Sequence, residues 1–215
     1  KFYTDPTRYE RTGQNNARAL LYDNKNRLWI ACKDKTIAIY DNSHNFLGYL
    51  HFDGSVSMQP DTSLGMAYAI TQDKSGTIWI GTKGNGLIEV QPGHSSLHFL
   101  LKQYKYSVED IYSLSHNDIY AVCEDAVGRI WIATFGGGVN YMEQIEGKTR
   151  FINYRNKLKK FPIPLCYRTR DLVSDGNGRI WIATSTGLLA CKEKFSDAEQ
   201  LEFEHYTRTP EDINS

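Results

Sequence analysis

The apolar positions of the chain recur with a period of about 50 residues. A short apolar run surrounds each tryptophan, and the spacings are 50, 52 and 50 residues between Trp29, Trp79, Trp131 and Trp181. The run is apolar on consecutive residues instead of alternating, which predicts a strand with both faces covered. Another apolar residue lies nine positions before each tryptophan, at Leu20, Ile70, Val122 and Leu172. The pattern therefore predicts four copies of one β-structural unit.

Polar and glycine positions follow the same register. An aspartate precedes each tryptophan by six residues, at Asp23, Asp73, Asp125 and Asp175. A glycine or an asparagine precedes it by three, at Asn26, Gly76, Gly128 and Gly178. Asp-x-x-Gly is typical of a type I turn closed by a left-handed residue, and asparagine tolerates that conformation better than most residues. We therefore predict a tight hairpin that leads into the tryptophan strand of every copy.

Two further strands are expected in each copy. A turn with glycine follows the tryptophan strand in the last three copies, at Gly84, Gly86, 136–138 and Gly187, and a short third strand comes next. A fourth strand is predicted at 49–52, 101–104, 151–154 and 203–206, and an aromatic residue lies 27 positions before each tryptophan, at Phe2, Phe52, Tyr104 and Tyr154. Four short strands per ~50 residues are typical of a β-propeller blade and fit a solenoid or a sandwich less well.

The expected fold class is all-β, a β-propeller segment of about four four-stranded blades. We place the blades at approximately 13–52, 64–104, 117–154 and 167–206. Residues 1–12 and 207–215 would then belong to links with flanking blades. An open ring leaves a blade face and sheet edges uncovered, so we expect these blades to be part of a larger propeller ring.

The motif D-x-x-G-x-[IL]-W-I-[GA]-T, followed by a glycine pair and an apolar residue, covers nearly the whole chain in four copies, three of them close. It resembles the two-component regulator propeller repeat. Proteins with such repeats are typically bacterial hybrid sensor kinases, in which two periplasmic propellers and a small β-sandwich precede one membrane helix and a cytoplasmic histidine kinase. In the gut-bacterial members the signal is commonly a breakdown product of a complex polysaccharide.

The resemblance implies a role for this segment and for the protein that contains it. The segment is expected to be a periplasmic, non-catalytic ligand-recognition part of an inner-membrane hybrid two-component sensor histidine kinase. The full-length protein is expected to form a homodimer and to respond to an oligosaccharide. Its other expected partners are flanking blades and domains of the same chain.

Charge and cysteine content narrow the function classes. Lys and Arg number 25 against 25 Asp and Glu, so no net field attracts nucleic acid. His94 and His98 are four residues apart, but in a loop that runs into a strand this spacing does not make a metal pair. We expect no metal and no cofactor. Neither a zinc site nor a dense disulfide scaffold is indicated by the four separate cysteines, for which we expect buried free thiols, at Cys32, Cys123, Cys166 and Cys191.

Chemistry by the repeated residues is not expected. Four aspartates at one register belong to turns, and the tryptophans belong to a core strand. A related turn occurs in sialidase-like propellers, which would suit a glycosidase, although no unrepeated cluster of carboxylates provides an acid/base and nucleophile pair. A lyase resembling streptogramin-inactivating enzymes or a plain interaction scaffold would also fit the fold. Fold alone does not choose among these functions, because function resides in sites grafted onto the fold.

The candidate ligand residues are the unrepeated ones in the turns and links around one mouth of the propeller channel. Basic residues crowd the link between the third and fourth blades, at Arg155, Lys157, Lys159, Lys160, Arg168 and Arg170. A cationic rim would favour an anionic ligand, whereas a solvated loop is the simpler interpretation. Aromatic faces stack on sugar rings, and two arginines two residues apart on a strand point to the same side. We therefore predict ligand contacts from Lys83, Asn85, Phe135, Tyr167, Arg168 and Arg170.

Overall fold

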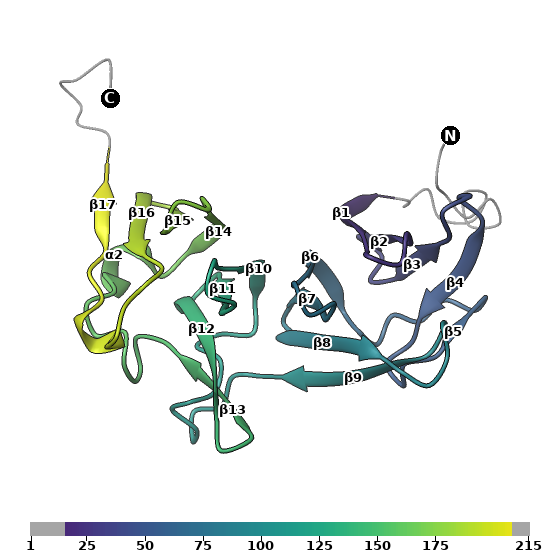
Figure 1. Cartoon of the computed structure of the whole chain (residues 1–215), viewed down its shortest axis with the longest axis horizontal. Coiled ribbons are helices and arrows are strands. Elements are labelled where there is room, and N and C mark those ends of the chain that lie inside the picture. Colours follow the sequence, from purple (N-terminus) through teal and green to yellow (C-terminus); the bar gives the residue numbers. More distant parts are fainter. Residues whose placement is uncertain (1–15, 208–215) are drawn as a thin grey trace, which may run out of the picture. The chain divides into compact units, whose positions relative to one another are not determined.

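The structure is a computed structural model that describes residues 16–207. The chain divides into two compact units, one up to Gln103 and the other from Tyr104 onward. The described residues form four antiparallel sheets, two in each unit (Figure 1). The aromatic residue expected at Phe2, the link expected at 1–12 and all but the first residue of the link expected at 207–215 lie outside the described residues.

The first unit contains a five-stranded and a four-stranded sheet. The five-stranded sheet has the order β1-β2-β3-β4-β5, with β1 at Ala17–Tyr22, β2 at Leu28–Cys32, β3 at Ile37–Tyr40, β4 at Phe46–Leu50 and β5 at Val56–Ser57. The four-stranded sheet has the order β6-β7-β8-β9, with β6 at Met66–Gln72, β7 at Ile78–Lys83, β8 at Leu87–Pro92 and β9 at Phe99–Tyr104. Strands that follow one another in the chain are therefore neighbours in each sheet, as in a propeller blade.

The second unit contains two four-stranded sheets of the same order. The third blade consists of β10 at Ile119–Glu124, β11 at Ile130–Thr134, β12 at Gly138–Ile145 and β13 at Lys148–Ile152. The fourth blade consists of β14 at Thr169–Ser174, β15 at Arg179–Thr184, β16 at Gly187–Lys192 and β17 at Glu204–Tyr206. A short helix, α2 at Ile163–Cys166, lies in the link between the two blades, and a 3₁₀ turn at Ala198–Gln200 precedes β17. The all-β propeller prediction is confirmed.

The outer strands differ in detail from the prediction. The strands β4 and β13 end at Leu50 and Ile152, so Phe52 and Tyr154 lie just beyond them instead of on them. The first sheet also has a fifth strand, because Ser57 pairs with Tyr49 at the end of β4. The strand β13 lies at a sheet edge and pairs on one side alone, whereas the end of β4 is set by the turn that leads into β5.

The repeated aspartate closes the hairpin between the first two strands of every blade. In the third blade, Asp125 Oδ1 accepts hydrogen bonds from Val127 N at 3.0 Å and from Arg129 N at 2.8 Å. Gly128 has a φ of 88°, a left-handed conformation that glycine adopts without a steric cost. The equivalent residues of the other copies also have positive φ, at Asn26, Gly76 and Gly178. The predicted turn is thus confirmed in all four copies.

The second carboxylate oxygen of this aspartate binds the repeated tryptophan. The indole Nε1 donates to Asp Oδ2 at 2.8, 2.7, 2.9 and 3.1 Å in the first to fourth copies. A buried indole N–H needs an acceptor, and the turn aspartate is the one that each hairpin provides. The six-residue spacing therefore reflects a hydrogen bond into the core as well as the turn.

The tryptophan strands form the core of the blades. The five residues of β11 are all buried, and Trp29 and Trp131 have no exposed surface. The prediction of a strand covered on both faces is confirmed for β2, β7 and β11. In the fourth blade it is wrong: Trp181 is only half-buried and Val173 is 56% exposed, because within the described part of the second unit no further sheet covers that side.

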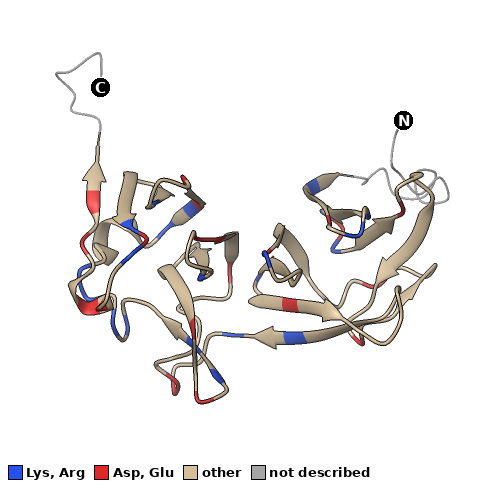
Figure 2. Cartoon of the chain, in the orientation of Figure 1, with Lys and Arg blue, Asp and Glu red and all other residues tan. Residues whose placement is uncertain are grey.

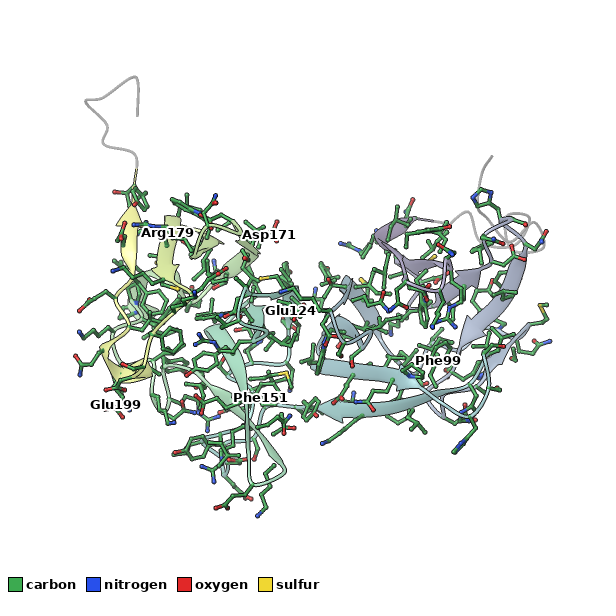
Figure 3. The ribbon with its side chains drawn as sticks, in the orientation of Figure 1. Phe99, Glu124, Phe151, Asp171, Arg179 and Glu199 are labelled. Carbon is green, nitrogen blue, oxygen red and sulfur yellow. The ribbon has the colours of Figure 1, made fainter. Side chains whose placement is uncertain are left out.

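An arginine two positions before the tryptophan connects neighbouring blades within each unit. Arg27 Nη1 donates to Ser96 O at 2.8 Å, and the guanidinium lies 5.1 Å above the Phe99 ring, which is labelled in Figure 3. In the second unit, Arg129 donates to the Glu193 carbonyl in the same way. The equivalent Arg179 instead pairs with a carboxylate of its own blade, on β17. The same residue thus bridges blades where a following blade is present in the unit.

Candidate ligand-binding site

Backbone hydrogen bonds in the second unit hold the β11–β12 turn against the link that enters β14. Phe135 and Arg168 form an isolated antiparallel bridge. The Tyr167 carbonyl accepts hydrogen bonds from Gly136 N at 3.0 Å and from Gly138 N at 2.9 Å. Residues of two blades therefore meet at one point, although 29 to 33 positions separate the paired residues in sequence.

The glycines of the turn allow this close approach. A Cβ atom on Gly136 would lie 2.6 Å from the His116 ring, and one on Gly138 would lie 2.4 Å from the Phe161 ring. Gly138 also has a φ of 66°, which strains any residue with a Cβ. The glycine run thus serves packing between the turn and its surroundings, and it places Phe135 at the end of β11.

Two arginines lie over the aromatic ring of Phe135. The guanidinium of Arg170 is 4.6 Å and that of Arg168 is 5.5 Å from the ring centroid. Arg168 also lies 5.1 Å from the ring of Tyr167. On the opposite strand, Tyr120 stacks on Phe135 with centroids 5.0 Å apart and the planes at 21°. We call these five residues the arginine–aromatic cluster.

The arginines of the cluster are available to an anion. Arg168, Arg170 and Tyr167 are exposed, and Phe135 is half-buried. Within residues 16–207, neither arginine forms a salt bridge with a carboxylate. Asp171, labelled in Figure 3, follows Arg170 on β14 and accepts a hydrogen bond from Leu172 N. Within this part of the chain the two exposed guanidinium groups contact aromatic rings and form no ion pair, so a carboxylate or sulfate can bind them.

Four of the six predicted ligand residues, namely Phe135, Tyr167, Arg168 and Arg170, meet in this cluster. The other two belong to the first unit. Asn85 is fixed by hydrogen bonds within the first unit. Its Nδ2 donates to Ser63 O and Leu64 O, each at 3.3 Å, and its backbone carbonyl accepts from Gln103 Nε2 at 2.8 Å. Lys83 is exposed at the end of β7. These contacts give Asn85 a structural task in the β7–β8 turn.

Most basic residues upstream in the same link have structural partners. Arg155 donates to Ser113 Oγ and to Val108 O, and its guanidinium lies over the Tyr106 ring. Lys157 and Lys160 form ion pairs with Glu143 and Glu202, respectively. Among residues 16–207, the basic side chains of this link that form neither a hydrogen bond nor an ion pair are Arg168, Arg170 and Lys159.

Tyr120 belongs to the cluster, although sequence reasoning did not select it. It lies eleven positions before Trp131, and Arg170 lies eleven positions before Trp181. The shared register is the signal that identifies it. His116 also lies nearby, against Gly136, and its Nδ1 accepts a hydrogen bond from Asp118 N at 3.0 Å.

Cysteine and histidine chemistry has little support in the described residues. All four cysteines are free, Cys166 and Cys191 are buried, and Cys32 and Cys123 are half-buried. Burial raises the pKa of the Cys123 and Cys191 thiols to about 12, which suppresses the reactive thiolate. Among residues 16–207, no group of three or more His, Cys, Asp or Glu side chains is arranged to hold a metal ion. Nor does this part of the chain contain a helix long and apolar enough to cross a membrane.

Family and structural comparisons agree with the blade architecture. Residues 63–84 and 113–136 match the two-component regulator propeller family. The chain therefore carries two-component regulator propeller repeats on a β-propeller fold. No curated protein matches the chain in sequence.

Solved structures with a similar fold include extracellular domains of two-component systems and a bacterial surface protein. The extracellular domain described for the hybrid two-component system BT3049 of B. thetaiotaomicron superposes with a TM-score of 0.66 at 19% identity over 90% of this chain and 25% of that one. The corresponding domain of BT4673 gives 0.62 at 20% identity over 90% and 24%. PorZ, a surface component of the type-IX secretion system of Porphyromonas gingivalis, gives 0.57 at 17% identity over 89% and 27%. The chain thus spans about a quarter of the length of each of these structures.

Proposed function

We propose that the chain is a ligand-recognition segment in the periplasmic region of a hybrid two-component sensor histidine kinase. The repeat family and the similarity to extracellular domains of such systems support this assignment. The protein that contains the segment would be an inner-membrane homodimer, with flanking blades that complete the propeller. The segment itself would bind a signal and perform no chemistry.

The arginine–aromatic cluster is the observation that supports ligand recognition. Tyr167 is exposed and offers a ring face on which a sugar can stack, and Arg168 and Arg170, which lie over the Phe135 ring, present planar guanidinium groups that match a carboxylate or sulfate. These groups lie where the β11–β12 turn meets the link that enters β14, whereas the repeated aspartates, glycines and tryptophans maintain the turns and the core. We therefore propose an oligosaccharide derived from a polysaccharide, with at least one anionic group, as the ligand.

Calorimetric titration of the chain with oligosaccharides of equal length tests this proposal. The panel contains a neutral trisaccharide, a uronic-acid trisaccharide and a sulfated one. Binding of an anionic member is expected, and Arg168→Ala/Arg170→Ala should weaken it by roughly 2–4 kcal/mol, at about 1.5–3 for each charged hydrogen-bonding group with partial redundancy. The matched control is Lys159→Ala/Lys194→Ala, which removes the same net charge from exposed positions outside the cluster.

The melting temperature separates recognition from structure. If the arginines bind ligand, their replacement should leave the melting temperature nearly unchanged, because both side chains are exposed. A double variant that keeps its affinity but loses stability would show that the arginines are ties between blades. Equal weakening by the lysine control would show that net charge alone attracts the ligand.

A further inference from the structure

A β-bulge occurs at one register in the first strand of every blade, which we call the innermost strand (β1, β6, β10 and β14). Each innermost strand pairs with the tryptophan strand, and the pairing slips between Ala17 and Ala19 in the first blade. The same slip occurs between residues 67 and 69, between 119 and 121, and between 169 and 171. The residue left out of the ladder is always the one eleven positions before the tryptophan, namely Arg18, Tyr68, Tyr120 and Arg170.

Only arginine and tyrosine occupy the four bulges. A bulge turns its extra residue away from the ladder and is often found next to binding sites. The flanking positions 17, 19, 67, 69 and 121 are alanines, and Ile119 and Thr169 are buried. Strand curvature explains why the fold contains a bulge here, but it does not require large side chains that combine a planar face with hydrogen-bond donors.

The bulged residues form an arginine–tyrosine pair in each unit. In the first unit, β1 lies against β6, and the Arg18 guanidinium is 4.4 Å from the centroid of the Tyr68 ring. In the second unit, β10 lies against β14, and Arg170 is 6.0 Å from the Tyr120 ring. Blue bands on β1 and β14 mark the basic positions of these innermost strands in Figure 2. The pairing therefore arises from the blade repeat, and it occurs twice.

The arginines of both pairs are exposed and the tyrosines are half-buried. Each pair thus presents a guanidinium fork at the surface beside a half-buried tyrosine ring. Arginine and tyrosine are the residues that most often dominate binding energy, because they combine rigid planar contact area with directional hydrogen bonds. The same combination suits a sugar ring that carries an acidic group.

We propose that the bulge register is a ligand-contact position, and that Arg18 and Tyr68 form a subsite for an anionic sugar in the first unit as Arg170 and Tyr120 do in the second. The inference rests on the proposed function for the ligand class, but it assigns binding to a unit in which the turn residue Asn85 is occupied by structural contacts. In each subsite the guanidinium binds a carboxylate or sulfate, and the exposed part of the tyrosine ring contacts the adjoining sugar.

An NMR titration of the whole ¹⁵N-labelled chain with the uronic-acid trisaccharide tests the first-unit subsite. The amides of 17–19 and 67–69 should shift together with those of 119–121 and 169–171. Arg18→Ala should raise the dissociation constant obtained from the first-unit shifts about tenfold, as expected for the loss of one charged contact. Arg18→Lys should keep only part of the wild-type affinity, because lysine lacks the planar fork of arginine. Lys33→Ala is the control, since it removes an exposed charge of the same unit outside the pair.

The outcomes distinguish this inference from the proposed function. Shifts confined to the second unit, with unchanged affinity in Arg18→Ala and Tyr68→Ala, would overturn the first-unit subsite and leave the proposed function intact. If no oligosaccharide binds, the proposed function fails, and inorganic sulfate then becomes the probe. If sulfate shifts the amides of 17–19 and the effect disappears in Arg18→Ala, the anion subsite is supported. If sulfate causes no such shifts, the subsite is overturned. Tyr68→Phe covers the case in which Tyr68→Ala does not fold.

Discussion

The turn aspartate should contribute much more stability in the third blade than in the fourth, although in both it accepts hydrogen bonds from two turn amides and from the indole. Asp125 is fully buried and accepts from Val127 N, Arg129 N and Trp131 Nε1. Asp175 accepts from the equivalent groups at 2.7, 3.1 and 3.1 Å, but it is exposed. Asp125 therefore differs from Asp175 in its burial and in an ion pair, in which Arg129 Nε lies 3.2 Å from Asp125 Oδ2.

The magnitude for Asp125→Ala follows from the donors that it leaves without an acceptor. Each hydrogen bond to a charged group contributes about 1.5–3 kcal/mol, and an unsatisfied buried donor costs about 1–3 kcal/mol. The buried Trp131 indole loses its partner completely, whereas the turn amides of Val127 and Arg129 have some access to water. We therefore expect a loss of roughly 3–5 kcal/mol in the free energy of unfolding. For Asp175→Ala we expect a clearly smaller loss, because water replaces the carboxylate.

Urea denaturation followed by tryptophan fluorescence measures both variants. Asp125→Asn should fall between wild type and Asp125→Ala, because its amide oxygen can still accept from the turn amides or from the indole. Equal losses for Asp125→Ala and Asp175→Ala would refute the argument from burial. A loss below about 1 kcal/mol for Asp125→Ala would refute the role of the indole bond.

Three further predictions concern the turn glycine, the stability at acidic pH and the reactivity of the thiols. Gly128→Val should lower the melting temperature far more than Val127→Thr, since only Gly128 has positive φ, and equal melting temperatures would contradict the turn assignment. Hydrogen bonds from the Trp181 indole and from the amides of Arg179 and Asn177 hold the pKa of Asp175 below its ordinary value of 3.8. The native state therefore favours the ionised carboxylate, so the stabilisation by Asp175 is present above about pH 4 and is lost as the pH falls through the lowered pKa. In Asp175→Asn the free energy of unfolding should decrease less steeply below about pH 4 than in the wild type, and an unchanged slope would count against this. Cys123 and Cys191 should resist a thiol reagent at pH 8 until the chain unfolds, because burial raises each pKa to about 12; modification of both at the rate of an exposed thiol would contradict that environment.

The hairpins were the most predictable part of the molecule, because their causes are local. Asp125 and Gly128 lie within one turn, and the preferences of these residue types fix its geometry without help from the rest of the chain. The bond from Asp125 to Trp131 was not foreseen, since it depends on how the indole is oriented within a packed blade. The ends of β4 and β13 were also misplaced, because outer strands end where pairing with their neighbour ends.

The candidate site was predictable only in part. Phe135, Arg168 and Arg170 were selected because they are unrepeated, and the fold brings them together through the bridge between residue 135 and residue 168. Tyr120 was missed because its importance depends on stacking across two strands, which sequence distance does not show. The half-buried state of Trp181 likewise depends on which surfaces pack on the fourth blade.

Hydrogen–deuterium exchange of the chain with and without oligosaccharide tests the central claim most directly. The amides of Gly136 and Gly138 bind the Tyr167 carbonyl, so a ligand on the arginine–aromatic cluster should slow exchange at 134–138 and 167–171. We predict this protection with the uronic or sulfated trisaccharide and none with the neutral one. Unchanged exchange in both segments at a saturating concentration of an anionic ligand that binds the chain would contradict the proposed recognition site.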